Sequence, residues 1–218
     1  MRFAAAALAL LAASAGCRED APAAAAPERP ELHLITALPL LFDEQFTLEG
    51  ERPAVAAWLD QRYRLSAIDL PSQLPPAATL LMIQPVALPA EELVSLDRWV
   101  RGGGRLLLLA DPRLEWPSER PLGDPLRPPP MYADTGLLGH WGLRLDSPER
   151  AGPVTIEGVT YGSPGTLVAN GPQCVVRNKV AARCKVGGGQ AVVVADADWI
   201  ADGAQADKLG ALIESLRR

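Results

Sequence analysis

The segment Thr79–Pro112, TLLMIQPVALPAEELVSLDRWVRGGGRLLLLADP, decides the fold of this chain, because it reads as strand, helix and strand. Thr79–Ile83 and Arg105–Ala110 are short apolar runs, typical of strands that are buried on both faces of a parallel sheet. Between them, Pro89 fits the first turn of a helix, and Gly102–Gly104 ends that helix. Two parallel strands joined by a helix need a crossover connection. The segment therefore predicts an α/β fold.

Further elements of the same two kinds flank this unit. We expect strands at 31–37, 64–70 and 190–195, and helices at 52–63, 134–141 and 205–216. Residues 153–185 differ, because short β-rich pieces alternate there with Gly, Pro and Asn, which predicts an antiparallel β insertion. The sequence thus predicts a single α/β domain over residues 31–218, with an open, mostly parallel sheet in three layers and a small β-rich insertion.

Composition limits the classes of function. The chain has 218 residues, 48% of them hydrophobic, and a formal net charge of −5, which suits one globular domain and gives no electrostatic reason to expect a nucleic-acid partner. Only two histidines and three cysteines are present, so a His-rich metal centre is excluded. We expect no bound cofactor.

The N-terminus has the pattern of an export signal. Arg2 precedes an apolar stretch, Phe3–Ala13, that is too short to span a bilayer. The small residues before Cys17 resemble a bacterial lipobox, which predicts a signal peptide over residues 1–16 and lipidation of Cys17. Ordinary cleavage after Ala15 is the alternative. Residues 17–30 would then form an Ala/Pro-rich tether at the periplasmic face of the envelope, and Arg18 favours the outer membrane over the inner one.

Two cysteines remain after lipidation of the first. Cys174 and Cys184 flank the sequence VVRNKVAAR, in which Asn178-Lys179 stands where a hairpin would turn. In an exported protein such a pair is most simply a disulfide. A catalytic thiol is the alternative, but no histidine or helix start neighbours either cysteine in the sequence.

Acidic residues follow two of the buried strands. Asp111 comes after one strand, and Asp196 and Asp198 come after another. Ligands of open α/β sheets bind beyond the carboxyl ends of the strands, and three carboxylates there could hold Mg²⁺ or Ca²⁺. The alternative, which the lack of a phosphate-binding glycine loop favours, is that these residues cap turns.

The segment from Asp111 to Tyr132 contains seven prolines and has no periodicity, so it predicts a long loop. Loops of this length in compact domains are usually functional or disordered. Trp116 within the loop and Tyr132 at its end are the residues that we expect to contact a partner. Neither a Gly-x-Ser-x-Gly elbow nor a well-placed histidine base is present, which argues against a hydrolase triad.

Three segments together resemble a known family: residues 80–112, then TGLLGHWGLRL at 135–145, then QAVVVADADWI at 190–200. The chain is similar to the periplasmic domain of gliding-motility-type ABC transporter auxiliary proteins, over about residues 31–216. The resemblance implies a flavodoxin-like or class I glutamine amidotransferase-like fold. It also implies that the chain has this fold without amidotransferase activity, because Asp111-Pro112 stands where the amidotransferase nucleophile would be a cysteine.

These observations predict a non-enzymatic exported lipoprotein that binds or scaffolds other components of the envelope. The resemblance implies an ABC transporter as partner, beside the membrane itself. The alternatives are a metal-dependent hydrolase that uses Asp111, Asp196 and Asp198, and a small-ligand-binding protein in which the long loop covers the strand ends.

Overall fold

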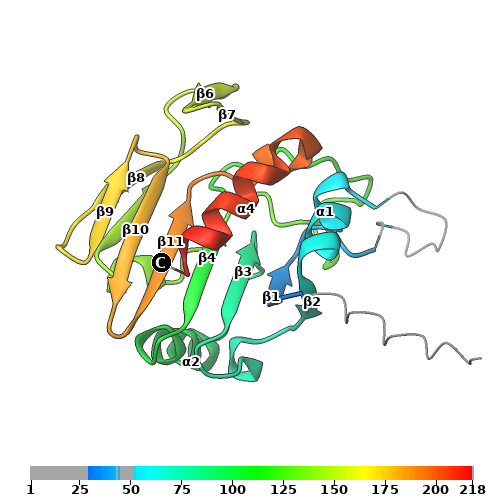
Figure 1. The fold of residues 1–218 in the computed structure, drawn as a ribbon. Coiled ribbons are helices and arrows are strands. Elements are labelled where there is room, and N and C mark those ends of the chain that lie inside the picture. Colours follow the sequence, from blue (N-terminus) through cyan, green and yellow to red (C-terminus); the bar gives the residue numbers. More distant parts are fainter. Residues whose placement is uncertain (1–28, 43, 45–51, 218) are drawn as a thin grey trace, which may run out of the picture.

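The computed structural model describes residues 29–42, 44 and 52–217. The predicted signal peptide, the predicted lipidation site Cys17 and most of the predicted tether lie outside these residues. The described part of the chain forms a seven-stranded, mostly parallel sheet and two small antiparallel sheets (Figure 1). This is a mixed α/β fold, as the sequence predicts.

Parallel strands form the centre of the main sheet, in the order β2-β1-β3-β4-β11. β3 and β4 are central and almost wholly buried, which explains why they read as continuous apolar runs rather than alternating ones. The parallel strands are β1 (Glu31–Thr36), β2 (Arg64–Ala67), β3 (Thr79–Ile83), β4 (Arg105–Leu109) and β11 (Gly189–Val194).

Helices cover both faces of this sheet and create two hydrophobic clusters. Because side chains alternate along a strand, Leu107 of β4 belongs to the cluster under α1 and α4, and Leu108 belongs to the cluster under α2 and α3. Figure 1 shows α1 and α4 in front of the sheet. The helices are α1 (Ala54–Arg62), α2 (Ala90–Arg101), α3 (Leu137–His140) and α4 (Ala206–Ser215), with 3₁₀ turns η1 (Pro71–Gln73), η2 (Asp198–Ala201) and η3 (Gly203–Gln205).

The β-rich part of the chain does not stay together as one insertion. Its strands are divided among the three sheets: β9 and β10 extend the main sheet beyond β11, β8 pairs with β5, and β6 pairs with β7. Pairing with β10 covers the edge that β11 would otherwise expose. These strands are β5 (Leu143–Asp146), β6 (Val154–Ile156), β7 (Val159–Tyr161), β8 (Thr166–Ala169), β9 (Cys174–Arg177) and β10 (Ala181–Val186).

The segment from Asp111 to Tyr132 is a long loop without helix or strand, as predicted. Its two ends meet, because the Tyr132 amide donates to the Asp111 carbonyl at 2.6 Å and the Leu114 amide donates to the Pro130 carbonyl at 2.9 Å. The loop thus leaves the sheet after β4, crosses the carboxyl ends of the strands, and returns to its starting point. It is closed at its base.

Candidate binding site at the carboxyl ends of the strands

The parallel strands all end at one edge of the sheet, and Asp111 lies there directly after β4. Its side chain is fully buried. One carboxylate oxygen accepts from the Ala197 amide at 2.8 Å, and the other accepts from the Arg113 amide at 2.8 Å. Asp111 therefore connects the start of the long loop to the segment that follows β11.

Asp196 and Asp198 make connections of the same kind. Asp196 is fully buried after β11, and its carboxylate accepts from the amides of Ser163 and Trp199, both at 3.1 Å. Asp198 accepts from the Glu115 amide in the long loop at 2.8 Å. The three acids predicted to gather at this edge do gather there, and each holds a different segment of backbone.

Burial changes how these acids titrate. Burial, together with the negative charge of Asp111, raises the pKa of Asp196 to about 7. Burial also raises the pKa of Asp198 to about 6, although the hydrogen bond from Glu115 opposes the shift. The pKa of Asp111 is raised by burial as well, against the hydrogen bonds from Ala197 and Arg113. The pKa values of Asp196 and Asp198 therefore lie closer to neutral pH than those of ordinary aspartates.

Amide donors occupy these carboxylate oxygens, so their geometry is that of turn-capping acids. In the part of the chain that the structure describes, no group of three or more His, Cys, Asp or Glu side chains is placed to hold a metal ion. The arrangement matches the turn-capping alternative, while a Mg²⁺ or Ca²⁺ site at Asp111, Asp196 and Asp198 stays a prediction.

Gln84, just after β3, completes the network and is not foreseen from the sequence. Its side chain is fully buried, and its carbonyl oxygen accepts from the Asp111 amide at 2.9 Å. Its amide nitrogen donates to the carbonyls of Asp111 and Pro129, both at 3.1 Å. The side chain of Gln84 therefore holds both ends of the long loop. The signal in the sequence is a polar residue placed between an apolar strand and a proline.

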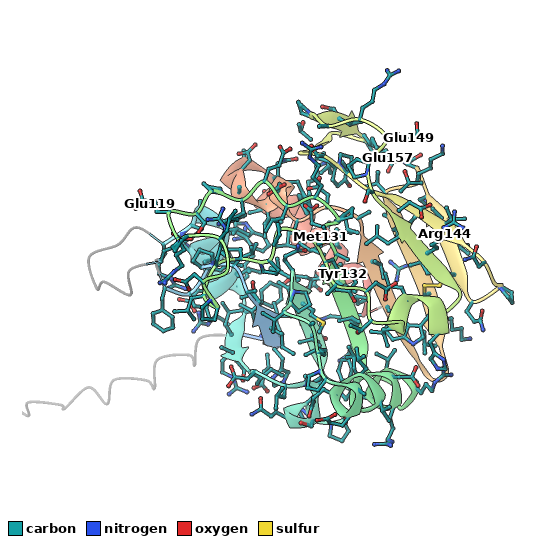
Figure 2. All side chains as sticks on the ribbon, turned by 180° about the vertical axis from the view of Figure 1, so that it is seen from behind. Glu119, Met131, Tyr132, Arg144, Glu149 and Glu157 are labelled. Carbon is teal, nitrogen blue, oxygen red and sulfur yellow. A yellow bond between two sulfur atoms is a disulfide. The ribbon has the colours of Figure 1, made fainter. Side chains whose placement is uncertain are left out.

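Trp116 and Tyr132, the predicted partner contacts, are both half-buried and pack against opposite hydrophobic clusters. Trp116 packs against the cluster under α1 and α4, and Tyr132 packs against the cluster under α2 and α3. Figure 2 shows Met131 and Tyr132 in the middle of the face that the loop crosses. Only part of each ring is thus accessible to a partner.

A cavity of about 320 Å³ lies between the ends of β1 and β3 and the long loop. Thr36 and Leu38 line it from β1 and the segment after it, Val86 lines it after β3, and Leu126 lines it from the loop. Arg127 also lines the cavity and donates to the carbonyls of Ser118 and Arg120.

Large apolar side chains are exposed on the segments that lead to and from this cavity. Five of the nine such side chains among the described residues follow β1 or β3 or lie in the long loop; three of them line the cavity, and the most exposed, Leu122 in the loop, is 85% accessible. We call this set the apolar face, and its members are Phe42, Val86, Leu122, Leu126 and Met131. The sequence contained the signal, which is apolar residues inside a proline-rich loop.

The predicted disulfide pair, Cys174 and Cys184, lies away from this site. The two cysteines lie directly opposite one another on β9 and β10 and form a disulfide, which confirms the prediction. Asn178 and Lys179 have φ values of 50° and 63°, as expected for the two central residues of a tight hairpin turn.

Residues 53–213 match a family described as "Domain of unknown function (DUF4350)". No curated protein matches the chain. Similar solved structures include an exo-β-1,4-mannosidase from Opitutaceae bacterium strain TAV5, with 16% identity and a TM-score of 0.49 over 86% of this chain and 35% of that one. A β-galactosidase from Rahnella sp. R3 has 14% identity and a TM-score of 0.44 over 88% of this chain and 32% of that one. The chain spans about a third of these enzymes' length, and at such values the likeness identifies no activity.

Proposed function

We propose a function from the geometry of the site, because the chain belongs to a family that is described only as a domain of unknown function (DUF4350). The domain is a non-enzymatic binding or scaffolding protein of the cell envelope, exported and lipid-anchored through Cys17. Its apolar face docks a segment of another envelope protein. The sequence resemblance to ABC transporter auxiliary proteins supports a transporter as the class of partner.

The concentration of exposed apolar side chains at one end of the sheet is the observation that carries this proposal. Contiguous apolar surface on a folded protein usually marks an interaction site. Charged side chains of both signs line the cavity beside this surface: Arg127, Glu44, and Arg120, which pairs with Asp124. A partner segment with apolar residues and polar flanks would fit both features.

The buried acids support a binding role more than a catalytic one. Asp111 accepts from the amides of Arg113 and Ala197, and Asp198 accepts from the Glu115 amide. These hydrogen bonds fix the start of the long loop against the segment that follows β11. Gln84 holds the other end of the loop through Pro129. A loop fixed at its base presents its apolar residues with little loss of conformational entropy on binding.

Two further observations support the proposal. The Cys174–Cys184 disulfide suits an oxidising compartment outside the cytoplasm. The order β2-β1-β3-β4-β11 supports a flavodoxin-like fold, related to that of class I glutamine amidotransferases. In flavodoxin-like sheets ligands bind where the strand order reverses, which here is the gap between β1 and β3 beside the cavity.

Crosslinking in intact envelopes, followed by a pull-down with the full-length chain, tests this proposal. We expect the native chain to enrich a membrane protein, and Leu126→Asp to lose that enrichment because it places a charge in the apolar face. Val175→Asp is the matched control, because Val175 is also exposed but lies on β9. Cys17→Ser tests whether the lipid anchor is needed. Equal enrichment by the native chain and Leu126→Asp would refute the apolar face as the docking surface.

A metal-dependent hydrolase is the second candidate, favoured by the pKa values of Asp196 and Asp198 at about 7 and 6. Titrating carboxyls of this kind occur at catalytic sites. Calorimetric titration with Mg²⁺ and Ca²⁺, repeated with Asp196→Asn, tests it. Heat of binding that disappears in the variant would support the candidate, and no heat from either protein would eliminate it.

A further inference from the structure

A second cavity, of about 450 Å³, lies at the opposite edge of the main sheet from the strand-end site, beside the amino ends of β4 and β11. Leu216 and Arg217 line it, so the end of α4 forms one of its walls, and Figure 1 shows that end of α4 in front of the same strands. Among the described residues that line this cavity, every charged side chain is a cation. We call it the basic hollow, and its cations are Arg105, Arg183, Lys185 and Arg217.

The strand register places three of these cations side by side. Gln190 of β11 pairs with Arg105 of β4 on one side and with Lys185 of β10 on the other, so the three residues form a row on one face of the sheet. Arg183 lies two residues before Lys185 in β10 and therefore points to the same face. Neighbouring strands are about 4.8 Å apart, so the backbones of Arg105 and Lys185 flank a gap of roughly 10 Å. A ligand that lies over Gln190 therefore has cations on both sides.

Uncharged acceptors hold the two arginines of the strands in place. Arg183 donates to Gln190 Oε1 and to Ser215 Oγ, both at 2.7 Å. Arg105 donates to the Ala77 carbonyl at 2.6 Å. Because none of these acceptors is an anion, both guanidinium groups are oriented but keep their full charge. Oriented guanidinium groups are the preferred donors for phosphate oxygens.

The remaining two cations differ in how they are paired. Lys185 is exposed, and its ammonium group has no hydrogen bond or ion pair with a described residue. Arg217 lies 3.5 Å from the carboxylate of Glu214. Three of the four cations thus lack an acidic partner within the described part of a chain whose formal net charge is −5. A concave surface lined by charges of one sign attracts ligands of the opposite sign.

We infer that the basic hollow is a binding site for a ligand that carries one or two phosphate groups. The phosphate oxygens lie over Gln190, accept from Arg105 on one side, and accept from Arg183 and Lys185 on the other. The volume of the hollow is within the range of small-molecule sites, about 300–1,000 Å³. The site lies at the opposite edge of the sheet from the apolar face and does not depend on the proposed function.

Two sources could supply such a phosphate, a phospholipid headgroup and a soluble phosphate ester. β1 begins at Glu31 on the same edge of the sheet as the basic hollow, because β1, β3 and β4 run in one direction. The proposed lipid anchor at Cys17 precedes β1 in the sequence, so the headgroup source, unlike the site itself, rests on the proposed function. Both sources offer the phosphate oxygens that arginine and lysine bind.

Calorimetric titration of the full-length chain with inorganic pyrophosphate tests the site. We expect saturable binding that Lys185→Gln weakens about three- to tenfold, because one charge-assisted hydrogen bond is lost. Arg105→Gln should weaken binding at least as much. Lys208→Gln is the matched control, because Lys208 is also an exposed lysine but lies on α4 outside the hollow, and it should leave the affinity unchanged. Cys17→Ser should also bind pyrophosphate as the native chain does, whatever the outcome for the lipid anchor.

Displacement of bound pyrophosphate distinguishes the two sources. Displacement by glycerol 1-phosphate in solution would assign the site to a soluble ester. Displacement by phosphatidylglycerol vesicles, but not by phosphatidylcholine vesicles, would assign it to an anionic lipid headgroup. No pyrophosphate binding, equal weakening by Lys185→Gln and Lys208→Gln, no weakening by Lys185→Gln, or displacement by neither phosphate source would each overturn the inference. If Arg105→Gln does not fold, Lys185→Gln at its exposed position still decides it.

Discussion

The two halves of the main sheet hold distant segments together by different chemistry. In the parallel half, buried carboxylates accept backbone amides over long stretches of chain: Asp111 and Ala197 are 86 residues apart, and Asp196 and Ser163 are 33 apart. In the antiparallel half, a covalent bond joins Cys174 to Cys184 across a separation of 10 residues. The parallel half should therefore respond to pH, and the antiparallel half to reduction.

This difference follows from what each half has to do. The β9–β10 hairpin is local and needs only its register fixed, which one cross-strand disulfide achieves. The carboxyl ends of the parallel strands must instead anchor loops that approach from several directions. A carboxylate has several acceptor sites, so Asp111 or Asp196 can hold two such segments at once.

Removing Asp111 should break the parallel half most severely. Asp111→Ala leaves the amides of Ala197 and Arg113 without their acceptor, and we expect the free energy of unfolding to fall by about 3–4 kcal/mol. Urea denaturation measures this loss. Asp146→Ala is the control, because Asp146 is an exposed acid paired with Arg144, and its loss should cost less than about 1 kcal/mol. Similar costs for the two variants would show that Asp111 holds no segment together.

Opening the disulfide should weaken the antiparallel half by a smaller amount. The double variant Cys174→Ala/Cys184→Ala should lower the free energy of unfolding by about 2–3 kcal/mol, because the unfolded chain regains the entropy of the closed loop. Denaturation with and without a thiol reductant checks this: the reductant should destabilise the native chain and leave the double variant unchanged. A reductant effect that persists in the double variant would place the sensitivity elsewhere.

The contrast between the halves also explains what the sequence could and could not predict. The strands at Thr79–Ile83 and Arg105–Leu109 follow from local apolar runs, and the disulfide follows from a turn flanked by two cysteines. Both patterns are contained in short stretches of chain. That β9 and β10 join the main sheet depends on which edge remains free after folding, which no local pattern states.

The candidate site could likewise be predicted only in part from the sequence. That Asp111 and Asp196 meet follows from parallel strands ending at one edge of a sheet. Whether their oxygens face a ligand or backbone amides depends on residues far along the chain, such as Ser163 and Ala197. Gln84 was missed because its role depends on where Pro129 returns to the sheet.

Raising the pH should weaken the parallel half and leave the antiparallel half unaffected. The pKa of Asp196 is about 7 in the folded chain against an ordinary value of 3.8, so the folded state binds more protons than the unfolded state between these values. The contribution of Asp196 to the free energy of unfolding is complete below its pKa in the unfolded chain, and it is lost as the pH rises through about 7. We expect a loss of about 2 kcal/mol between pH 5 and pH 8.

Asp196→Asn tests that assignment, because asparagine cannot titrate. The variant has its own fixed cost, but its stability should depend less on pH between 5 and 8 than that of the native chain. Urea denaturation at several pH values measures both slopes. A slope that stays the same in Asp196→Asn would assign the pH dependence to another group, with Asp198, at a pKa of about 6, the next to replace.

The smallest effect is expected from His33, and it tests whether every buried polar group in the parallel half contributes to stability. His33 in β1 is 5% exposed, yet neither ring nitrogen has a partner among the described residues, in contrast to Asp111, Asp196 and Gln84. Desolvating unpaired nitrogens costs free energy that an apolar side chain of similar size would not incur. His33→Leu should therefore raise the free energy of unfolding by about 1 kcal/mol, and thermal and urea denaturation measure it.

The chain has one other histidine, His140, which serves as the matched control. It is exposed at the end of α3 and lies 3.6 Å from the carboxylate of Asp97. His140→Leu removes this contact without relieving any buried group, so it should leave stability unchanged or slightly lower. A gain from His33→Leu that His140→Leu does not share would mean that the parallel half carries one unused polar group beside its satisfied acids. A loss from His33→Leu would mean that the imidazole is needed in β1, and that the buried polar groups of this half all serve the fold.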